Sequence, residues 1–407
     1  MELTETRSPL FDSARAHRHM ADAGVDAVLA ATLENVYYYS QVWSENFEVL
    51  PRRTQLYVLV TADAVHRPTL ISGVEEAANI YDAIRDDLDV YFAGRFFRFV
   101  DESSELSELS RYVRSHVIDG SSHATLPDAT VAAVRDAGLA GGTVAYDERG
   151  MFPESLAAIQ AQLPDVTFVP GSELLRRIRA VKTVEEQERL RRSAQITESG
   201  IAAALEIATE GVREADLIDA FEATVLAAGA RLRFAQIAFG ERGATGYVMN
   251  RTAALKASDI IRFDVGCSFR GYQSDIARNY SIAEPPAKAQ RLHAAMLEGE
   301  EAAVAALRPG RPVREVVAAA IDSIRAAGVE GYDRHHIGHG IGLDVYDFPI
   351  LTSATDDLVE AGMVVAVETP YYELGFAGLH PEDPVLVTED GAEYLTSSSR
   401  ALKWGKV

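Results

Sequence analysis

The sequence predicts two domains, an α/β domain at the N-terminus followed by an α+β domain. Three observations lead to this prediction. Strands and helices alternate over the first 170 residues, a helix pair followed by strands occurs twice in the remainder, and 407 residues with 47% hydrophobic content suffice for two cores. Alternating strands and helices favour a mostly parallel sheet covered on both faces. We place the domains at residues 1–170 and 171–407.

Short apolar runs in the first domain are predicted to be strands. The predicted strands are residues 26–30, 56–60, 69–72, 90–92 and 143–147, and the predicted helices are residues 13–23 and 75–86. No phosphate-binding glycine loop follows these strands, so a dinucleotide is not expected to bind. The aromatic residues Tyr37, Tyr38, Tyr39 and Trp43 are compatible with a ligand pocket. A place in the core or at a subunit interface is preferred for them.

The second domain is predicted to begin between residues 170 and 183. Thr183 and Glu186 have the spacing of a capping box, so a long helix is expected from there to about residue 208. Residues 210–217 and 310–317 each open a further helix after a helix, which indicates a weak internal duplication. Two such halves meeting face to face would form one sheet with helices outside and a cleft inside.

The segment Ile260–Ile282 is predicted to be a β-hairpin that carries two aspartates, Asp264 and Asp275. Apolar and polar residues alternate up to a turn at Phe269–Tyr272, and an extended pattern follows the turn. The two carboxylates can therefore face one another across the strand pair. Like charges at this separation need a metal ion, a proton or an arginine to compensate them. The alternative is that both aspartates are solvated. Cys267, within the hairpin, is expected to be a packing residue.

Three later residues, His339, Glu368 and Glu382, extend this pattern to a metal site. His339 lies among glycines, Glu368 ends the apolar strand 363–367, and Glu382 precedes the strand 384–387. Singly, the histidine could be structural and Glu368 could simply reach solvent. Together with the two aspartates they form an oxygen-rich set whose four carboxylates would balance two divalent ions.

Composition restricts the class of partner and the compartment. The formal net charge is −22, which disfavours nucleic acid and anionic membranes as partners. One cysteine excludes an internal disulfide framework and suits a reducing compartment. The N-terminal residues lack the pattern of a signal peptide, and no apolar run reaches the length of a membrane helix. A cytoplasmic location is therefore expected.

The five residues and the motifs around them resemble the pita-bread metallopeptidases. The motifs are FDVG, SDIAR, GHGIGLDV, GMVVAVET and PEDPVLVTEDG. This group contains methionine aminopeptidase, Xaa-Pro aminopeptidase, prolidase and their relative creatinase. The resemblance covers essentially the whole chain, because GVDAVLAATLENVYYYS is similar to the creatinase/prolidase N-terminal domain. Methionine aminopeptidases lack that domain, so the resemblance points to the prolidase/creatinase branch.

The resemblance implies an α/β N-terminal domain, a pita-bread (creatinase/aminopeptidase-like) catalytic domain and a centre of two divalent ions. These ions are usually manganese, with cobalt or zinc as alternatives. By resemblance, Asp264 would chelate one ion, Asp275 and Glu382 would bridge both, and His339 with Glu368 would complete the other. Glu368 would also be the proton shuttle. Relatives with this N-terminal domain usually form homodimers, and the same is expected here.

Several positions on the substrate side depart from the pattern of proline-specific members. Tyr346 replaces a histidine seven residues after His339, and Tyr247 lies in a segment where another histidine is usual. His380 replaces an arginine two residues before Glu382, and Ala277 replaces a threonine. His335, four residues before His339, is retained. We expect Tyr247, His335, Tyr346 and His380 to bind the substrate, and His335 and Tyr346 to act with Glu368 in catalysis.

The expected function is hydrolysis of a C–N bond in a small substrate by a dinuclear metalloenzyme. The first hypothesis is an Xaa-Pro dipeptidase-like or aminopeptidase-like activity. The second is hydrolysis of a non-peptide metabolite, such as an ectoine-type cyclic amidine or an acyl amino acid. A third is a metal-assisted lyase in which Tyr247 or Tyr346 serves as the base. A pure scaffold role leaves the five retained ligands unexplained.

Overall fold

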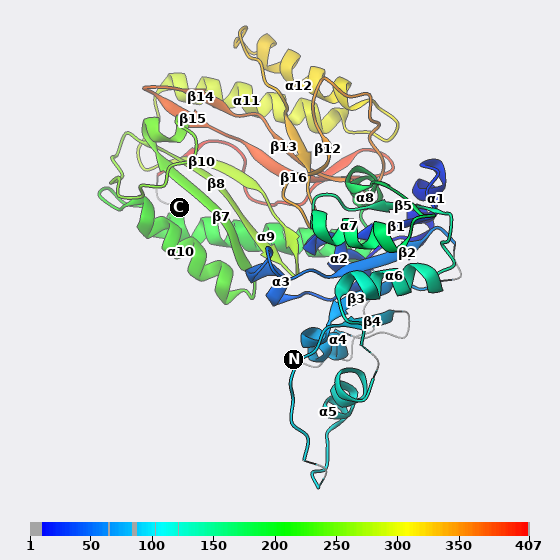
Figure 1. Ribbon diagram of the computed structural model, residues 1–407. Helices are drawn as coiled ribbons and strands as arrows, with labels where there is room; N and C mark the ends of the chain where they lie inside the picture. The colour runs from blue at the N-terminus through cyan, green and yellow to red at the C-terminus, as the bar shows by residue number, and fades with distance from the viewer. Residues whose placement is uncertain (1–9, 64–65, 84–87, 102, 121, 406–407) are drawn as a thin grey trace. The chain divides into compact units, whose positions relative to one another are not determined.

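The computed structural model describes residues 10–63, 66–83, 88–101, 103–120 and 122–405. The chain divides into two compact units, one ending at Ile178 and one beginning at Arg179 (Figure 1). Within the described residues, no helix is both long enough and apolar enough to cross a membrane.

The N-terminal unit contains a six-stranded mixed sheet in the order β4-β3-β2-β1-β5-β6. The pairs β3–β4, β1–β5 and β5–β6 are parallel, whereas β1–β2 and β2–β3 are antiparallel. The sheet is therefore only partly parallel, and its last strand was not predicted. The strands are β1 (Ala27–Ala30), β2 (Tyr57–Thr61), β3 (Thr69–Gly73), β4 (Asp89–Ala93), β5 (Thr143–Tyr146) and β6 (Thr167–Pro170).

Helices pack against this sheet around an apolar core that includes Leu29, Tyr57 and Val134. Tyr38 and Tyr39, on α2, are fully buried, which confirms the preference for a core role at these two positions. Residues 84–86 of the predicted helix 75–86 lie outside the described residues. The helices are α1 (Ser13–Asp22), α2 (Leu33–Ser40), α3 (Glu45–Val49), α4 (Ala77–Ala83), α5 (Glu108–Val113), α6 (Leu126–Asp136), α7 (Pro153–Gln162) and α8 (Ser172–Arg179).

The C-terminal unit is built on one large sheet with the path β12-β11-β13-β16-β10-β8-β7. Strands from both halves of the sequence meet where β10 pairs with β16. The two halves thus share a single sheet. Its strands are β7 (Arg231–Phe239), β8 (Ile260–Phe269), β9 (Tyr272–Gln273), β10 (Ile276–Ser281), β11 (Gly338–Gly340), β12 (Asp347–Ile350), β13 (Val364–Glu368), β16 (Glu382–Val387), β17 (Ala392–Tyr394) and β18 (Lys403–Trp404), and a separate hairpin contains β14 (Tyr371–Glu373) and β15 (Ala377–Leu379).

Two helix pairs, α9 (Val184–Glu206) with α10 (Glu214–Ala227) and α11 (Ala287–Ala306) with α12 (Val313–Ala326), accompany this sheet (Figure 1). The predicted capping box is present at the start of α9, where Thr183 and Glu186 bond each other's backbone amides. A glycine with a left-handed backbone precedes the second helix of each pair, Gly211 at φ 89° and Gly310 at φ 82°. The same left-handed glycine before the second helix of each pair agrees with the predicted duplication.

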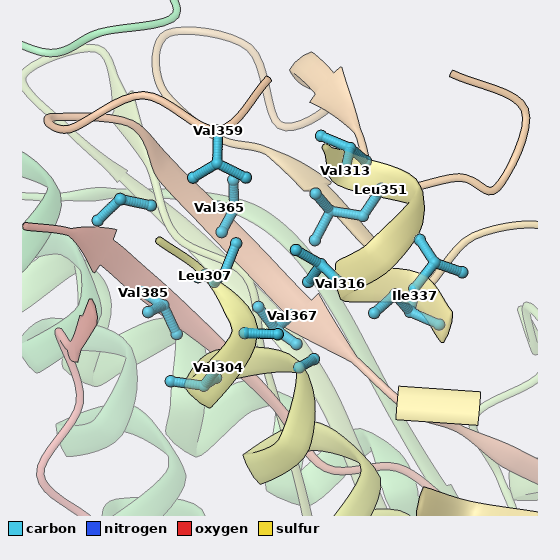
Figure 2. Close-up of a cluster of buried hydrophobic side chains, with 14 of the residues drawn as sticks. Val304, Leu307, Val313, Val316, Ile337, Leu351, Val359, Val365, Val367 and Val385 are labelled. Atoms are coloured by element: carbon cyan, nitrogen blue, oxygen red, sulfur yellow. The ribbon is translucent and has the colours of Figure 1, made fainter. Parts of the chain in front are cut away.

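An apolar cluster joins α11 and α12 to one face of the sheet (Figure 2). Val365 and Val367 of β13 and Val385 of β16 belong to this cluster. Because side chains alternate along a strand, Ala366 and Glu368 lie on the opposite face. The helices thus cover one face, and the other face presents Glu368 of β13 and Glu382 of β16.

The aspartate hairpin forms as the alternation of its sequence predicted. Strand β8 pairs antiparallel with β10, and Phe269 lies opposite Tyr272 across a two-residue turn. Arg270 and Gly271 in this turn have φ values of 50° and 88°. Two successive left-handed residues are typical of the type I′ turn, whose twist matches that of the flanking strands.

Gly271→Ala is expected to destabilise the C-terminal unit by about 1 kcal/mol, because a Cβ atom disfavours the left-handed backbone at this turn. A loss of this size should lower the thermal unfolding temperature by about 2–4 °C. The matched control is Gly331→Ala, since a Cβ at Gly331 would have no atom within 4 Å. Equal unfolding temperatures for the two variants would contradict the role of the turn.

Candidate metal centre

One row of residues across the C-terminal sheet carries three of the five predicted ligands. Asp264 on β8 lies opposite Ala277 on β10, Ala277 lies opposite Glu382 on β16, and Glu382 lies opposite Glu368 on β13. Residues directly opposite one another share a face of the sheet, so the three carboxylates project to the same side. Ala277 contributes only a methyl group between Asp264 and Glu382.

The other two predicted ligands lie in the adjacent row on the same face. Asp275 precedes Ala277 by two residues, and His339 on β11 lies opposite Ala366, two residues before Glu368. A spacing of two residues keeps side chains on one face of a strand. The structure therefore brings together all five residues that the sequence predicted.

The ligand atoms form two groups that share Glu382. Asp275, His339 and Glu382 make one group, and Glu368, His380 and Glu382 make the other, with all ligand atoms of a group within 4.8 Å of one another. His339 Nε2 lies 3.7 Å from Asp275 Oδ2, and His380 Nε2 lies 3.3 Å from an oxygen of each glutamate. Grouped in this way, each set has one imidazole and two carboxylates.

Burial and mutual repulsion raise the proton affinity of two of these carboxyls. Burial, followed by the charges of Asp264 and Glu368, raises the pKa of Asp275 well above its usual range. Burial and the same neighbours, with Asp275, raise the pKa of Glu382 in the same way. The cluster thus holds more negative charge than its own basic residues compensate, and this excess suits divalent cations.

Glu368 is the exception among the buried carboxyls. Burial alone would raise its pKa, but contacts with His336 and His380 and the charge of Arg334 outweigh burial, and the pKa of Glu368 lies below its usual range. His336 Nδ1 lies 3.1 Å from one oxygen of Glu368, and Arg334 Nη2 lies 3.3 Å from the other. Glu368 is therefore ionised at neutral pH.

His339 is oriented as a metal ligand requires. Its Nδ1 lies 3.0 Å from the carbonyl oxygen of Gly340, so Nδ1 carries the proton and Nε2 presents its lone pair. Burial lowers the pKa of His339, which keeps the ring neutral. Within the described part of the chain, Asp275 Oδ1, His339 Nε2 and His380 Nε2 are buried without a hydrogen-bond partner. Unpaired buried donor and acceptor atoms of this kind fit the coordination of metal ions.

A buried ion pair on the opposite face holds the two central strands in register. Arg278, next to Ala277, binds both carboxylate oxygens of Asp383, next to Glu382, at 2.6 and 3.0 Å. Arg278 Nη1 also donates to the backbone carbonyl of Glu382 at 2.9 Å. Because neighbours in a strand point to opposite faces, this pair fixes the positions of Asp275 and Glu382 from behind.

Tyr346, one of the predicted substrate residues, lies against the cluster. Its ring stacks on His339 with centroids 3.7 Å apart, and half of the side chain is exposed. Burial, then the charges of Glu368 and Glu382, raise the pKa of Tyr346, so its hydroxyl stays protonated. Arg179 holds the chain on both sides of Tyr346 through ion pairs of 2.6 Å with Asp344 and 3.2 Å with Asp347.

Tyr247, His335 and His336 occupy different environments. Tyr247 is largely exposed, and partial burial, followed by the charges of Asp264 and Asp275, raises its pKa. His335 is exposed, whereas its neighbour His336 contacts Glu368. Strict alternation from His339 would not bring His336 to this face, but Gly338 has φ 138° and breaks the alternation. The structure therefore brings His336, rather than His335, to the cluster.

Sequence reasoning also missed a support formed by Arg262 and Tyr372. Arg262 Nη1 donates to the Tyr372 hydroxyl at 3.0 Å and lies 3.6 Å from Asp264. The Tyr372 hydroxyl lies 3.3 Å from Nδ1 of His380. Arg262 precedes Asp264 by two residues on the same strand, which was an available signal, but Tyr372 comes from the separate β14–β15 hairpin.

Two family models match the chain. The model described as metallopeptidase family M24 matches residues 188–389, which contain all five predicted ligands. The model described as the creatinase/prolidase N-terminal domain matches residues 13–181. An uncharacterized peptidase of Staphylococcus aureus (strain USA300) is 31% identical over 224 residues, or 54% of this chain. The match spans 64% of that relative's own length.

Solved structures of similar fold cover nearly the whole chain. The Xaa-Pro dipeptidase from Bacillus anthracis is 24% identical with a TM-score of 0.78, over 96% of this chain and 98% of that one. The X-Pro aminopeptidase from Thermotoga maritima is 22% identical with a TM-score of 0.75, over 97% and 99%. These similarities confirm the predicted fold class of an α/β domain followed by a pita-bread domain. The chain belongs to metallopeptidase family M24 and carries the N-terminal domain of the creatinase/prolidase type.

Proposed function

We propose that the protein is a metal-dependent hydrolase that cleaves a C–N bond, amide or peptide, in a small substrate. The observation that carries this proposal is the gathering of Asp264, Asp275, His339, Glu368 and Glu382 on one face of the sheet. Buried atoms of Asp275 and His339 have no hydrogen-bond partner within the described residues. Membership of the M24 family supports the same chemistry.

We propose two divalent ions as the cofactor, manganese first, with cobalt and zinc as alternatives. Asp264, Asp275, His339, Glu368 and Glu382 would hold them. When bound, such a pair polarises a carbonyl oxygen and lowers the pKa of a water molecule. Oxygen-rich ligand sets suit manganese, and imidazoles suit zinc and cobalt, so the residues present are compatible with each of these ions.

Glu368 is the residue proposed to move the proton. Arg334 and His336 keep its carboxylate ionised, so an oxygen of Glu368 can accept a proton from the attacking water. The same carboxyl can then return the proton to the leaving nitrogen. In this role His336 is a positioning residue, and it takes the place that we predicted for His335.

Tyr346 is proposed to stabilise negative charge on the substrate. The raised pKa keeps its hydroxyl protonated, so the hydroxyl can donate a hydrogen bond to a carbonyl oxygen on which charge develops. A tyrosine cannot carry positive charge as a histidine can. Tyr247 is proposed to contact the substrate as well.

Tyr346→Phe is expected to lower kcat/KM by about 10²-fold, since one hydrogen-bond donor to the developing charge is lost. Metal content should stay as in the wild-type protein, because a phenol is not among the proposed ligands. Tyr371→Phe is the control: its hydroxyl lies 2.7 Å from Glu373 and not at the cluster. Equal kcat/KM for Tyr346→Phe and wild type would remove Tyr346 from the mechanism.

The substrate class is best resolved by a panel assayed with manganese. Xaa-Pro dipeptides, acyl amino acids and ectoine-like cyclic amidines represent the first two hypotheses. Tyr346, Tyr247 and His380 stand where proline-specific members have other residues, and this departure supports the metabolite as second candidate. We expect release of a free amine from at least one dipeptide. Cleavage of a metabolite alone would select the second candidate, and an unsaturated product would select a lyase.

Partners and location stay proposals drawn from the sequence. We propose a homodimer in the cytoplasm that binds a small molecule or short peptide and has neither nucleic acid nor membrane as a partner. The net charge of −22 supports the exclusion of nucleic acid and membrane, and the single buried cysteine, Cys267, supports the cytoplasm. The homodimer is proposed from the family resemblance alone. Light scattering after size-exclusion chromatography should give twice the chain mass of 44.2 kDa.

A further inference from the structure

We propose that His380 is itself a metal ligand, so that the ion held by Glu368 and Glu382 is also bound by an imidazole. The sequence predicted only a substrate-binding role for this residue. The inference rests on the proposed function to the extent that the cluster must bind metal, but it assigns a ligand that the function does not require.

The position of the ring carries the argument. His380 is buried, and its Nε2 lies 3.3 Å from Oε2 of Glu368 and 3.3 Å from Oε2 of Glu382. Ligand atoms about 2.0–2.1 Å from a tetrahedral zinc ion lie about 3.3 Å apart, so these separations suit a shared ion. His380 Nε2 nevertheless has no hydrogen-bond partner within the described residues. A buried nitrogen that lies between two carboxylates without a hydrogen bond has the placement of a metal ligand.

The surroundings of His380 hold this ring in place. The backbone N–H of His380 donates to Asn279 Oδ1 at 2.6 Å. On the ring, Nδ1 lies 3.3 Å from the Tyr372 hydroxyl, whose oxygen accepts a hydrogen bond from Arg262 at 3.0 Å. A tyrosine oxygen has two lone pairs, so it can also accept the proton of Nδ1. The lone pair of Nε2 then points to the glutamates, as in other sites where an outer partner sets the tautomer.

The arrangement also makes the two ligand groups alike. His339 serves the group with Asp275, His380 serves the group with Glu368, and Glu382 belongs to both. Each ion would then have one imidazole. Imidazole ligands favour zinc and cobalt over manganese, so His380 would shift the metal preference of the centre in that direction.

The competing explanation is that His380 serves as a cation, an imidazolium that neutralises the two glutamates without touching metal. The variants His380→Ala and His380→Arg separate the two explanations, because arginine supplies a positive charge but no lone pair. His336→Ala is the matched control, since His336 contacts Glu368 but lies in neither ligand group.

The experiment measures metal binding directly. Full-length protein is freed of metal, checked for folding by circular dichroism, and titrated with Zn²⁺ and with Mn²⁺ by calorimetry. Wild type is expected to bind two ions per chain, and His336→Ala should bind two ions with at most the weakening of about 10–100-fold that follows loss of a residue supporting a ligand. Both His380 variants should bind one ion with wild-type affinity and the other more than about 100-fold more weakly, because a ligand itself is lost.

Zinc X-ray absorption provides a second readout that does not depend on activity. Two imidazoles per pair of zinc ions are expected in wild type, and one in His380→Ala. Wild-type affinity for both ions in His380→Arg would overturn the ligand assignment and leave the proposed function standing. A folded wild-type protein that binds no metal would overturn both.

Discussion

Asp275→Asn is expected to reduce kcat/KM by at least about 10³-fold, the largest effect that any single substitution at this site should have. Asp275 stands between two groups of opposite character, with His339 Nε2 3.7 Å away and the charges of Asp264 and Glu368 beside it. An amide retains the shape of the side chain but loses the charge that binds a cation. Loss of an ion removes several kcal/mol of transition-state stabilisation, and each 1.36 kcal/mol is tenfold in rate.

Asp275→Asn should lower activity but raise the stability of the metal-free protein. Burial, followed by repulsion from Asp264 and Glu368, disfavours the charged form of Asp275, so a neutral amide suits this position better in the absence of metal. The metal-free variant should therefore unfold at a higher temperature than the metal-free wild type. This rise in unfolding temperature would show that activity is lost because metal no longer binds, and not because the protein misfolds.

The control for Asp275→Asn is Asp322→Asn, at an exposed position of α12. It removes the same charge at an exposed position outside the row of predicted ligands. This variant should change neither activity nor unfolding temperature by a measurable amount. The steady-state rate, the metal content and a thermal scan of both variants complete the test. Retained activity in Asp275→Asn with two bound ions would remove this residue from the centre.

Removal of the metal is the second change with a large expected effect. Chelation should abolish activity, and readdition of Mn²⁺ or Zn²⁺ should restore it. A ligand present at 100 times its dissociation constant stabilises a protein by about 2.7 kcal/mol. For a unit of this size the corresponding rise in unfolding temperature is about 5–10 °C.

The rise in unfolding temperature that metal binding causes should grow with pH. The direction of this pH dependence follows from the raised pKa values. In the metal-free protein the pKa values of Asp275 and Glu382 lie above those of unfolded carboxyls, about 4. Between the pKa of unfolded carboxyls and the raised pKa values of Asp275 and Glu382, the native state therefore binds more protons than the unfolded state. Stability from these two groups is present at low pH and is lost as the pH rises through the raised values.

Metal binding has the reverse dependence, because the ligands must be deprotonated. The increase in unfolding temperature on adding Zn²⁺ should therefore be larger at about pH 8 than at about pH 6. Metal-free Asp275→Asn should show a flatter loss of stability with pH than metal-free wild type. A metal-induced increase that shrinks from the lower to the higher pH would contradict the protonation states assigned to Asp275 and Glu382.

Local patterns were sufficient to predict the hairpin, its turn and the N-terminal capping box of α9. The alternation along β8 places Asp264 and Val265 on opposite faces whatever the rest of the chain does, and Arg270–Gly271 can close only a tight turn. Thr183 and Glu186 lie within one helical turn of each other. In each case the interacting groups are neighbours in sequence, so their contact depends on local geometry alone.

The pairing of distant strands was beyond such reasoning. Nothing in the residues around Ala277 indicates that Glu382 lies opposite, because β10 and β16 are far apart in the sequence. In the structure the Arg278–Asp383 ion pair joins the same two strands behind this pairing. The five ligands were gathered in the prediction through the resemblance to a family, and the structure supplies the physical reason in two adjacent rows on one face of the sheet.

The sequence indicated which residue types could supply the chemistry, because the carboxylates and the histidine lie in motifs that together resemble those of one family. Tertiary structure decided which of the polar neighbours reach that chemistry. The left-handed backbone at Gly338 brings His336 to Glu368 and leaves His335 exposed. Tyr372, from another hairpin, orients His380 between Glu368 and Glu382. These contacts depend on the backbone path and on packing between distant segments, and a linear pattern of residues records neither.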